Sequence, residues 1–185
     1  MINKPIRIFS GKYRSTRIIV PNIPGLRPTL GRVRETLFNW LYNLWKGEFH
    51  NKSVLDLFAG SGALGFEAAS RGFSKVDMFE INKKAVHALH VLKKRINAEN
   101  VNIKLSNSEI AIQHLNLQFD LILLDPPFNQ NLIEKIWLKL PRILKNKGLI
   151  YIESNIALQD IKDFRFKYQG KVSNVYFYLL GQIDK

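Results

Sequence analysis

Two hydrogen-bond acceptors suited to an amine follow a hydrophobic run. Residues 121–124 are wholly apolar, as in strands buried on both faces of a parallel sheet, and Asp125-Pro126-Pro127-Phe128 follows directly. The prolines stop the strand because they cannot donate to the sheet ladder. The Asp125 carboxylate and the Pro126 carbonyl can each accept one N–H of an exocyclic amine, while Phe128 can stack on the ring. A simple strand-ending turn with a core aromatic explains the segment equally well.

A glycine-rich loop follows an earlier predicted strand. Asp56-Leu57-Phe58-Ala59-Gly60-Ser61-Gly62 stands at a strand-to-helix turn, where glycine lets the backbone approach a ligand closely. Glu80 ends the next predicted strand, where an acid can accept hydrogen bonds from ribose hydroxyls. Both S-adenosylmethionine and NAD need that ribose contact, and Gly60, Gly62 and Gly65 also fit the dinucleotide fingerprint.

The carboxylate of Asp56 distinguishes these two cofactors. An acid at the start of the loop would lie near the pyrophosphate of NAD and repel it, whereas it suits the ammonium and sulfonium groups of S-adenosylmethionine. The amine-binding segment at Asp125 also favours a methyl donor. We therefore predict S-adenosyl-L-methionine as the cofactor, with an NAD oxidoreductase as the disfavoured alternative.

Composition indicates a single domain of a cytoplasmic protein. The 185 residues can build their own core, and they include no run of apolar residues long enough for a membrane helix and no visible secretory signal. The chain has no cysteine, which fits a reducing compartment. Its four histidines form no metal-ligand pattern, and His87 and His90 share a predicted helix face with lysines on a solvated surface. We expect no metal and no membrane partner.

The charge points to a polyanion. The net charge is +13, and residues 1–46 contain nine basic residues and one acid, Glu35. Such a local excess favours nucleic acid, although a merely solvated surface or a patch for anionic lipid is the alternative.

The predicted elements position these motifs. Short strands at 6–9 and 16–20 form a basic hairpin, and a helix over 32–45 can turn Arg32 and Arg34 outward. Strands and helices then alternate, which predicts an α/β fold. We expect strands at 54–57, 76–79, 101–105, 119–124 and 149–153. We expect helices at 63–71, 83–97, 109–115 and 132–140, the last ended by Pro141. A terminal hairpin, with strands 164–168 and 172–180, is expected to turn at Gln169-Gly170. The boundary near residue 50 divides the chain into a basic extension, 1–50, and an α/β domain, 51–185.

The motifs resemble those of a known family. The glycine loop, Glu80 and Asp125-Pro126-Pro127-Phe128 are similar to the motifs of class I, Rossmann-like methyltransferases that act on amino groups. The N-terminal blocks more narrowly resemble the bacterial 16S ribosomal RNA guanine-N2 methyltransferases of the guanine-966 type. These blocks are Ser10-Gly11-Lys12-Tyr13-Arg14, Pro24-Gly25-Leu26-Arg27-Pro28-Thr29 and Arg32-Val33-Arg34-Glu35-Thr36-Leu37-Phe38-Asn39-Trp40-Leu41.

The resemblance implies a mostly parallel seven-stranded sheet with an antiparallel C-terminal hairpin, S-adenosylmethionine as donor, and 16S ribosomal RNA in the small subunit or an assembly intermediate as partner. We expect a monomer. The catalytic residues would be Asp125, Pro126, Pro127 and Phe128. The donor would be held by Asp56, Phe58, Ala59, Gly60, Ser61, Gly62, Glu80, Ile81 and Asn107. Nucleic acid would be bound by Arg7, Lys12, Tyr13, Arg14, Arg17, Arg27, Arg32 and Arg34.

Two departures and two alternatives accompany the resemblance. Asn107 stands where the family has an acid that contacts adenine, and its carbonyl can still accept from the adenine amine. Leu30-Gly31 stands where family members often have an acid. Because Asp-Pro-Pro-Phe also occurs in DNA adenine-N6 methyltransferases, such an enzyme is one alternative. A non-catalytic RNA-binding or assembly factor is the other.

Overall fold

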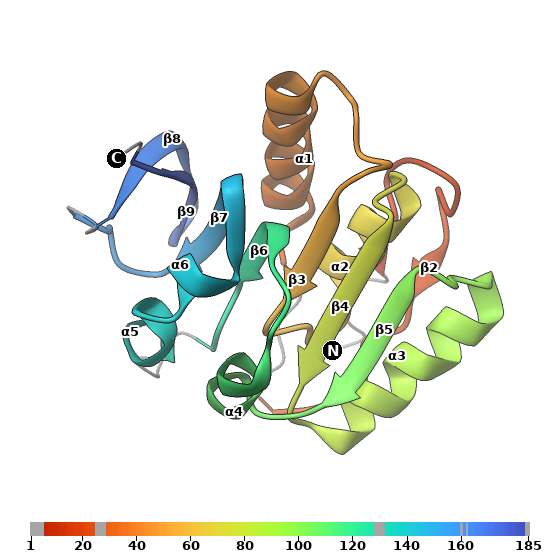
Figure 1. The fold of residues 1–185 in the computed structure, drawn as a ribbon. Coiled ribbons are helices and arrows are strands. Elements are labelled where there is room, and N and C mark those ends of the chain that lie inside the picture. The colour runs from red at the N-terminus through yellow and green to blue at the C-terminus, as the bar shows by residue number, and fades with distance from the viewer. Residues whose placement is uncertain (1–5, 25–28, 128–131, 160, 162, 184–185) are drawn as a thin grey trace.

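A seven-stranded sheet forms the centre of the molecule (Figure 1). The computed structural model describes residues 6–24, 29–127, 132–159, 161 and 163–183. The strands lie in the order β5-β4-β3-β6-β7-β9-β8, the first five parallel and β9 antiparallel to both of its neighbours. Their bounds are β3 Ser53–Asp56, β4 Lys75–Glu80, β5 Val101–Leu105, β6 Phe119–Leu124, β7 Leu144–Ser154, β8 Phe164–Val172 and β9 Val175–Gln182. The predicted fold class is confirmed.

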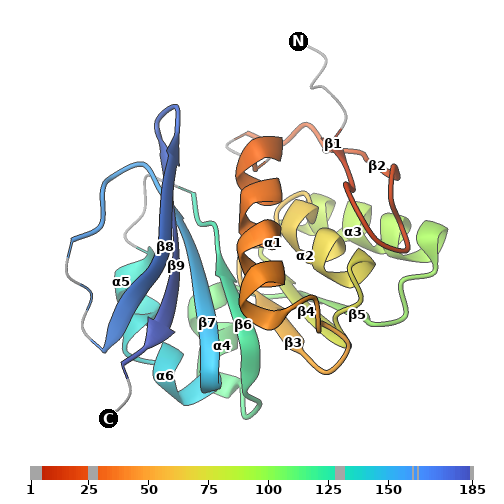
Figure 2. The ribbon, with the colours of Figure 1, turned by 90° about the horizontal axis from the view of Figure 1, so that it is seen from above.

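Three helices cover each face of the sheet (Figure 2). One face carries α1 Gly31–Trp45, α2 Ala63–Ser70 and α3 Lys83–Ile96, and the other α4 Ser108–His114, α5 Leu132–Trp137 and α6 Leu140–Ile143. Successive strand residues point to opposite faces. Leu121 and Leu123 of β6 therefore join the core under α1 to α3, and Ile122 and Leu124 join the core under α4 to α6. An apolar run without alternation is what such a doubly covered strand requires.

Two predicted breaks in the C-terminal half are wrong. Pro141 does not end the helix that starts at Leu132; it lies in the first turn of α6, where its missing N–H costs no hydrogen bond. The terminal hairpin turns between Val172 and Val175, not at Gln169-Gly170. Gly170 lies in β8 opposite Phe177, and a Cβ there would stand 2.4 Å from the Phe177 ring. This glycine makes room for a ring, not for a turn.

The N-terminal segment packs on the helices of the first face (Figure 2). Its strands β1 Ile6–Arg7 and β2 Arg17–Ile18 pair antiparallel and are shorter than predicted. Lys12 N–H donates to the Ser70 carbonyl at 2.8 Å, and Tyr13 N–H donates to Ser70 Oγ at 2.8 Å. The hairpin tip therefore lies at the end of α2 that is remote from the glycine loop.

Aromatic stacking joins α1 to the C-terminal hairpin. The Trp40 ring stacks on Tyr168 and on Phe177, each with centroids 5.2 Å apart. Helix α1 is thereby packed against the C-terminal hairpin on the first face of the sheet.

Candidate functional site

The glycine loop and the Asp125 segment lie at one edge of the sheet, on neighbouring strands. β3 and β6 pair in parallel with Asp56 beside Leu123, and Leu57 N–H donates to the Leu123 carbonyl at 3.2 Å. Both segments therefore leave the carboxyl ends of adjacent strands, where ligands bind in open α/β sheets. Pro126 is buried and Pro127 is exposed, whereas Phe128 lies outside the described residues.

The backbone of the loop requires its glycines. Gly60 and Gly62 have φ angles of 53° and 80°, a region that other residues rarely adopt. A Cβ on Gly62 would stand 2.5 Å from the Leu89 side chain of α3. The tight turn directs the chain into α2, with Gly62 N–H donating to the Ala59 carbonyl at 2.7 Å.

Glu80 binds the glycine loop and also lies at the carboxyl end of the strands, where a ligand would bind. One carboxylate oxygen accepts from Gly60 N–H at 2.8 Å and the other accepts from Asn82 N–H at 2.8 Å. Each carboxylate oxygen can accept a further hydrogen bond, so ribose hydroxyls can still be bound. The sequence prediction assigned Glu80 to a ligand alone, but this side chain also fixes the loop that would hold it.

Asp56 is a buried carboxylate with an unsatisfied oxygen. It is 1% exposed, its Oδ1 accepts a hydrogen bond from Phe58 N–H at 3.3 Å, and its Oδ2 has no hydrogen-bond partner. Burial, together with the Asp125 and Glu80 carboxylates, raises the pKa of Asp56 to about 7. A buried oxygen of this kind costs free energy unless a donor or a cation reaches it. The site thus fits a positively charged ligand.

The other predicted donor residues lie in this loop or follow the next two strands of the sheet. Ala59 and Ser61 are buried, Phe58 is half-buried, and Ile81 is exposed. The Asn107 side chain caps α4, accepting from Glu109 N–H at 2.7 Å. A carbonyl oxygen has two lone pairs, so this cap is compatible with an adenine contact.

Thr29 reaches Asp125 from the N-terminal segment. Its hydroxyl donates to Asp125 Oδ2 at 2.9 Å. Sequence reasoning missed this residue, because no local pattern relates two side chains that are 96 positions apart.

The predicted nucleic-acid residues divide into exposed and buried ones. Those exposed are Arg7, Lys12, Arg14, Arg17 and Arg32. Tyr13 is 8% exposed, with its hydroxyl donating to the Asn97 carbonyl at 3.2 Å, and Arg27 lies outside the described residues.

The outward orientation predicted for Arg34 is wrong, because this residue is fully buried. Its guanidinium lies 4.4 Å from the Phe9 ring centroid, with Nε 3.7 Å from Glu67 Oε2 and Nη2 donating to the Arg7 carbonyl at 2.5 Å. Burial lowers the pKa of Arg34, although the Glu67 carboxylate opposes this effect. Arg34 shares the buried face of α1 with Phe38 and Leu41, at helical spacing, and that spacing was the signal available in the sequence.

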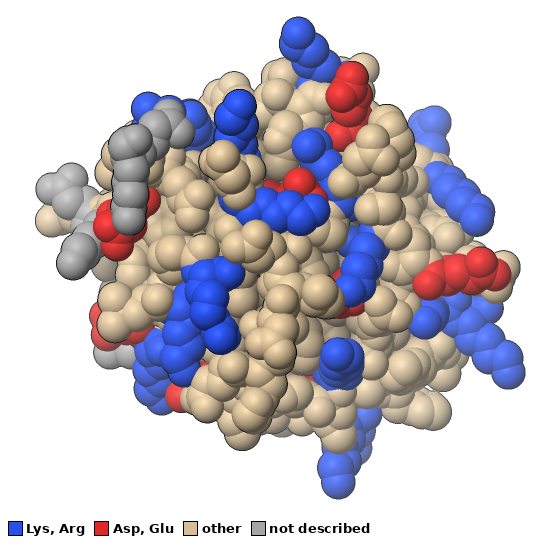
Figure 3. Space-filling view, in the orientation of Figure 1, with Lys and Arg blue, Asp and Glu red and all other residues tan. Residues whose placement is uncertain are grey.

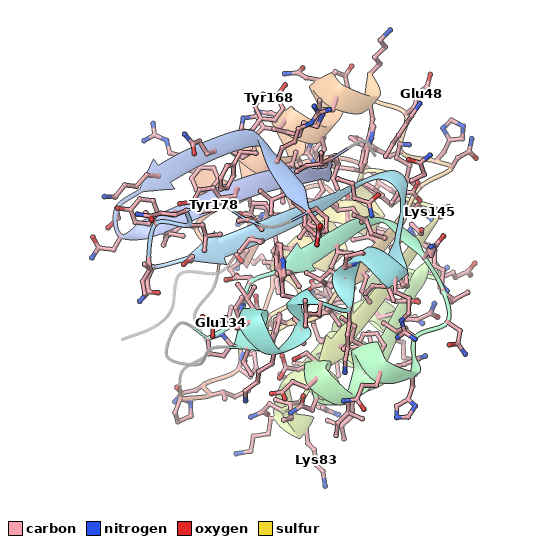
Figure 4. The ribbon with its side chains drawn as sticks, turned by 60° about the vertical axis from the view of Figure 1, so that its left-hand side comes forward. Glu48, Lys83, Glu134, Lys145, Tyr168 and Tyr178 are labelled. Carbon is pink, nitrogen blue, oxygen red and sulfur yellow. The ribbon has the colours of Figure 1, made fainter. Side chains whose placement is uncertain are left out.

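The exposed face of α3 adds to the positive surface. It carries Lys83, Lys84, His87, His90, Lys94 and Arg95. Lys83 points away from the body of the molecule where α3 begins (Figure 4). At the other end of the helix, the Arg95 guanidinium donates to the Arg17 carbonyl of β2. On the face that carries α4 to α6, lysine and arginine stand among uncharged surface and a few acids (Figure 3).

Two features are absent from the described part of the chain. None of its helices has the length and apolar character needed to cross a membrane. Within the same residues, no group of three or more His, Cys, Asp or Glu side chains is arranged to hold a metal ion.

Comparisons with known proteins agree with this geometry. The family model described as conserved hypothetical protein 95 matches residues 6–179. Ribosomal RNA small subunit methyltransferase D of Buchnera aphidicola subspecies Baizongia pistaciae is 36% identical, over 97% of this chain and 93% of the relative. The protein of the same name from Escherichia coli K12 is 37% identical, over 82% of this chain and 75% of the relative. The solved structure of yhhF from Escherichia coli superposes with a TM-score of 0.86 and 31% identity, covering 98% of this chain and all of that one. The chain therefore belongs to the conserved hypothetical protein 95 family, together with the ribosomal RNA small subunit methyltransferases D.

Proposed function

We propose that the protein transfers the methyl group of S-adenosyl-L-methionine to the exocyclic N2 amine of a guanine in 16S ribosomal RNA of the small subunit. The pairing of β3 with β6 carries this proposal, because it sets a cation-suited loop beside two acceptors for an amine. The names of the relatives support the ribosomal substrate. We expect a monomer acting in the cytoplasm, where ribosomal subunits are assembled.

The residues of the loop fit the donor. The positive φ angles of Gly60 and Gly62 shape the tight loop, the Glu80 oxygens can accept from ribose hydroxyls, and the unsatisfied Asp56 Oδ2 suits a cationic group. The donor supplies a methyl group on a positively charged sulfur. Ile81 and Asn107, which follow β4 and β5, are the residues that we assign to the adenine ring.

The Asp125 segment prepares the amine. The guanine N2 is a poor nucleophile because its lone pair is delocalised into the ring. The Asp125 carboxylate and the Pro126 carbonyl would each accept one of its hydrogens and so direct the lone pair at the methyl carbon. The bound donor would supply the methyl group for the new N–C bond and would keep the electron pair of the C–S bond on sulfur. Asp125 stabilises the positive charge on nitrogen until one proton leaves to water. Alignment of the two reactants supplies most of the acceleration.

The RNA would lie along α3 and the hairpin. Lys83, His87, His90 and Lys94 follow one another at helical spacing, and α3 itself contains no acid. This face begins beside Glu80 and ends where Asn97 meets Tyr13 of the hairpin, a span of about 21 Å for such a helix. The exposed face of α3 therefore runs from the end of the sheet that carries the glycine loop to the basic tip of the N-terminal hairpin. The target guanine must leave its stack to enter the site, as in other enzymes that modify bases.

Substitution of Asp125 tests this function. At about pH 8, where Asp56 is ionised in both proteins, we expect Asp125→Ala to bind S-adenosylmethionine as the wild type does, because it leaves the loop intact. Methyl transfer to small subunits should fall by about 100-fold or more. The measurements are calorimetry for donor binding and incorporation of labelled methyl groups into 16S RNA, mapped by mass spectrometry. Unimpaired turnover would remove Asp125 from catalysis. Methylation of duplex DNA in place of small-subunit RNA would contradict the substrate.

A further inference from the structure

We propose that Thr29 is a positioning residue for the methyl transfer, holding the Asp125 carboxylate in the orientation that accepts the target amine. The proposal rests on the function proposed above and extends it to the N-terminal segment. That segment would then complete the catalytic site as well as contact RNA.

The contact joins two distant parts of the chain at the reacting edge. Thr29 lies just before α1, and Asp125 just after β6. The Thr29 hydroxyl donates to Asp125 Oδ2 at 2.9 Å, in a half-buried setting. Hydrogen bonds to an ionised acceptor are shorter and stronger than those between neutral groups, so this bond can select one carboxylate rotamer.

The start of α1 shows that this bond is not a by-product of helix capping. Threonine is a favoured N-cap residue, and its hydroxyl would ordinarily satisfy an N–H of the first turn. Here Leu30 is the N-cap residue, and α1 begins without any side-chain cap. The hydroxyl beside an uncapped helix is instead directed across the molecule to Asp125.

Contacts of Leu30, Gly31 and Phe9 constrain the backbone next to Thr29. Arg34 N–H donates to the Leu30 carbonyl at 3.1 Å, and a Cβ on Gly31 would stand 3.0 Å from the Phe9 ring. Phe9 N–H in turn donates to Glu67 Oε2 at 2.8 Å, inside α2. Although Phe9 and Leu30 are partly exposed, these contacts link the residues beside Thr29 to the first turn of α1 and to the buried Glu67 of α2, which gives the Thr29 hydroxyl a defined direction.

Acceptance from Thr29 is compatible with acceptance from the substrate. A carboxylate has about four lone-pair sites on its two oxygens, so a hydroxyl bound to one oxygen leaves capacity for an amine proton. If the Thr29 hydroxyl merely blocked the site, its removal would raise kcat, whereas removal of a positioning contact would lower it. The sign of the change in kcat therefore separates positioning from blocking.

The test compares Thr29→Ala, Thr29→Ser and Thr36→Ala in the full-length protein. Thr36 lies on α1 and donates to the Arg32 carbonyl at 2.8 Å, so its replacement removes a similar hydroxyl that does not reach Asp125. We expect Thr29→Ala to lower kcat about 10- to 100-fold, as loss of a hydrogen bond to a charged group predicts. The KM for small subunits and the Kd for S-adenosylmethionine should change less than about twofold. Thr29→Ser should restore most of kcat, and Thr36→Ala should equal the wild type.

Each other outcome is decisive. A kcat for Thr29→Ala equal to that of the wild type would overturn the proposal, as would an increase, which would mean that the hydroxyl obstructs the amine. A change confined to KM would assign Thr29 to RNA binding instead. If the wild type itself methylated no small-subunit RNA, the proposed function would fail and this role with it. If the wild type and Asp125→Ala differ while Thr29→Ala does not, only the positioning role fails.

Discussion

The buried Asp56 carboxylate gives the proposed donor site a pH dependence. Burial chiefly raises the pKa of Asp56 from its ordinary 3.8 to about 7, the neighbouring Asp125 and Glu80 carboxylates add to the effect, and the Phe58 N–H opposes it. The pKa of Asp56 is higher in the folded protein than in the unfolded chain. Protonation of Asp56 therefore stabilises the folded protein. Its contribution, roughly 4 kcal/mol, is fully present below about pH 4 and lost as the pH rises through 7.

Donor affinity should change with pH in the opposite direction. A cation favours ionised Asp56, so we expect the affinity for S-adenosylmethionine to rise about tenfold from pH 6 to pH 8. Asp56→Asn should bind more weakly and show no such rise. The measurement is calorimetric titration at both pH values. Asp77→Asn is the matched control, since Asp77 is a buried aspartate of β4 that pairs with Lys75 and Asn102 and should leave the rise intact. A constant affinity in the wild type would contradict a cation at Asp56.

At the scale of elements, α1 carries two arginines with different roles. Arg34 is fully buried against Glu67 and Phe9, whereas Arg32 is exposed on the same helix. We expect Arg34→Ala to lower the free energy of unfolding by about 3 kcal/mol, because it leaves part of a buried ionic cluster without its partner. Arg32→Ala should change stability by less than about 0.5 kcal/mol and weaken RNA binding.

Denaturant unfolding and RNA filter binding on the two variants check this difference. Glu67→Gln is an additional control, because it removes the charge that faces both Arg34 and Arg71 while keeping the shape of the side chain. Equal stability of Arg34→Ala and Arg32→Ala would contradict the structural role of the buried guanidinium.

The order of elements was predictable from sequence because each signal is local. Hydrophobic runs and glycines gave the strands of the α/β half, and the rule that parallel strands share an edge placed Asp56 and Asp125 together. Contacts between distant segments were not predictable. Gly170 was read as a turn because the Phe177 ring that it accommodates comes from the facing strand. Trp40 likewise gave no sign that it stacks on Tyr168, which is why the attachment of α1 to the terminal hairpin was missed.

At the scale of the whole molecule, the carboxyl and amino ends of the parallel strands differ in role. The carboxyl ends carry the glycine loop, Asp125 and the start of α3, while the amino ends carry Lys52 and Lys75 at the beginnings of β3 and β4. Both of these lysines are occupied within the protein. Lys52 lies 4.7 Å from the Trp45 ring centroid, and Lys75 pairs with Asp77 at 3.1 Å. The lysines of α3 are therefore better placed to contact RNA than Lys52 and Lys75 are.

Lysine substitutions on α3 and at the amino ends of β3 and β4 distinguish an RNA-binding surface along α3 from a general attraction by net positive charge. We expect the double variant Lys83→Gln with Lys94→Gln to weaken binding of small-subunit RNA and to reduce the slope of log affinity against log salt by about 2, one for each lost phosphate contact. Lys52→Gln with Lys75→Gln removes the same net charge and should leave the slope unchanged. Calorimetry with S-adenosylmethionine should be unaffected in both. Equal slopes for the two pairs would mean that net charge alone attracts the RNA and that α3 does not guide it to the site.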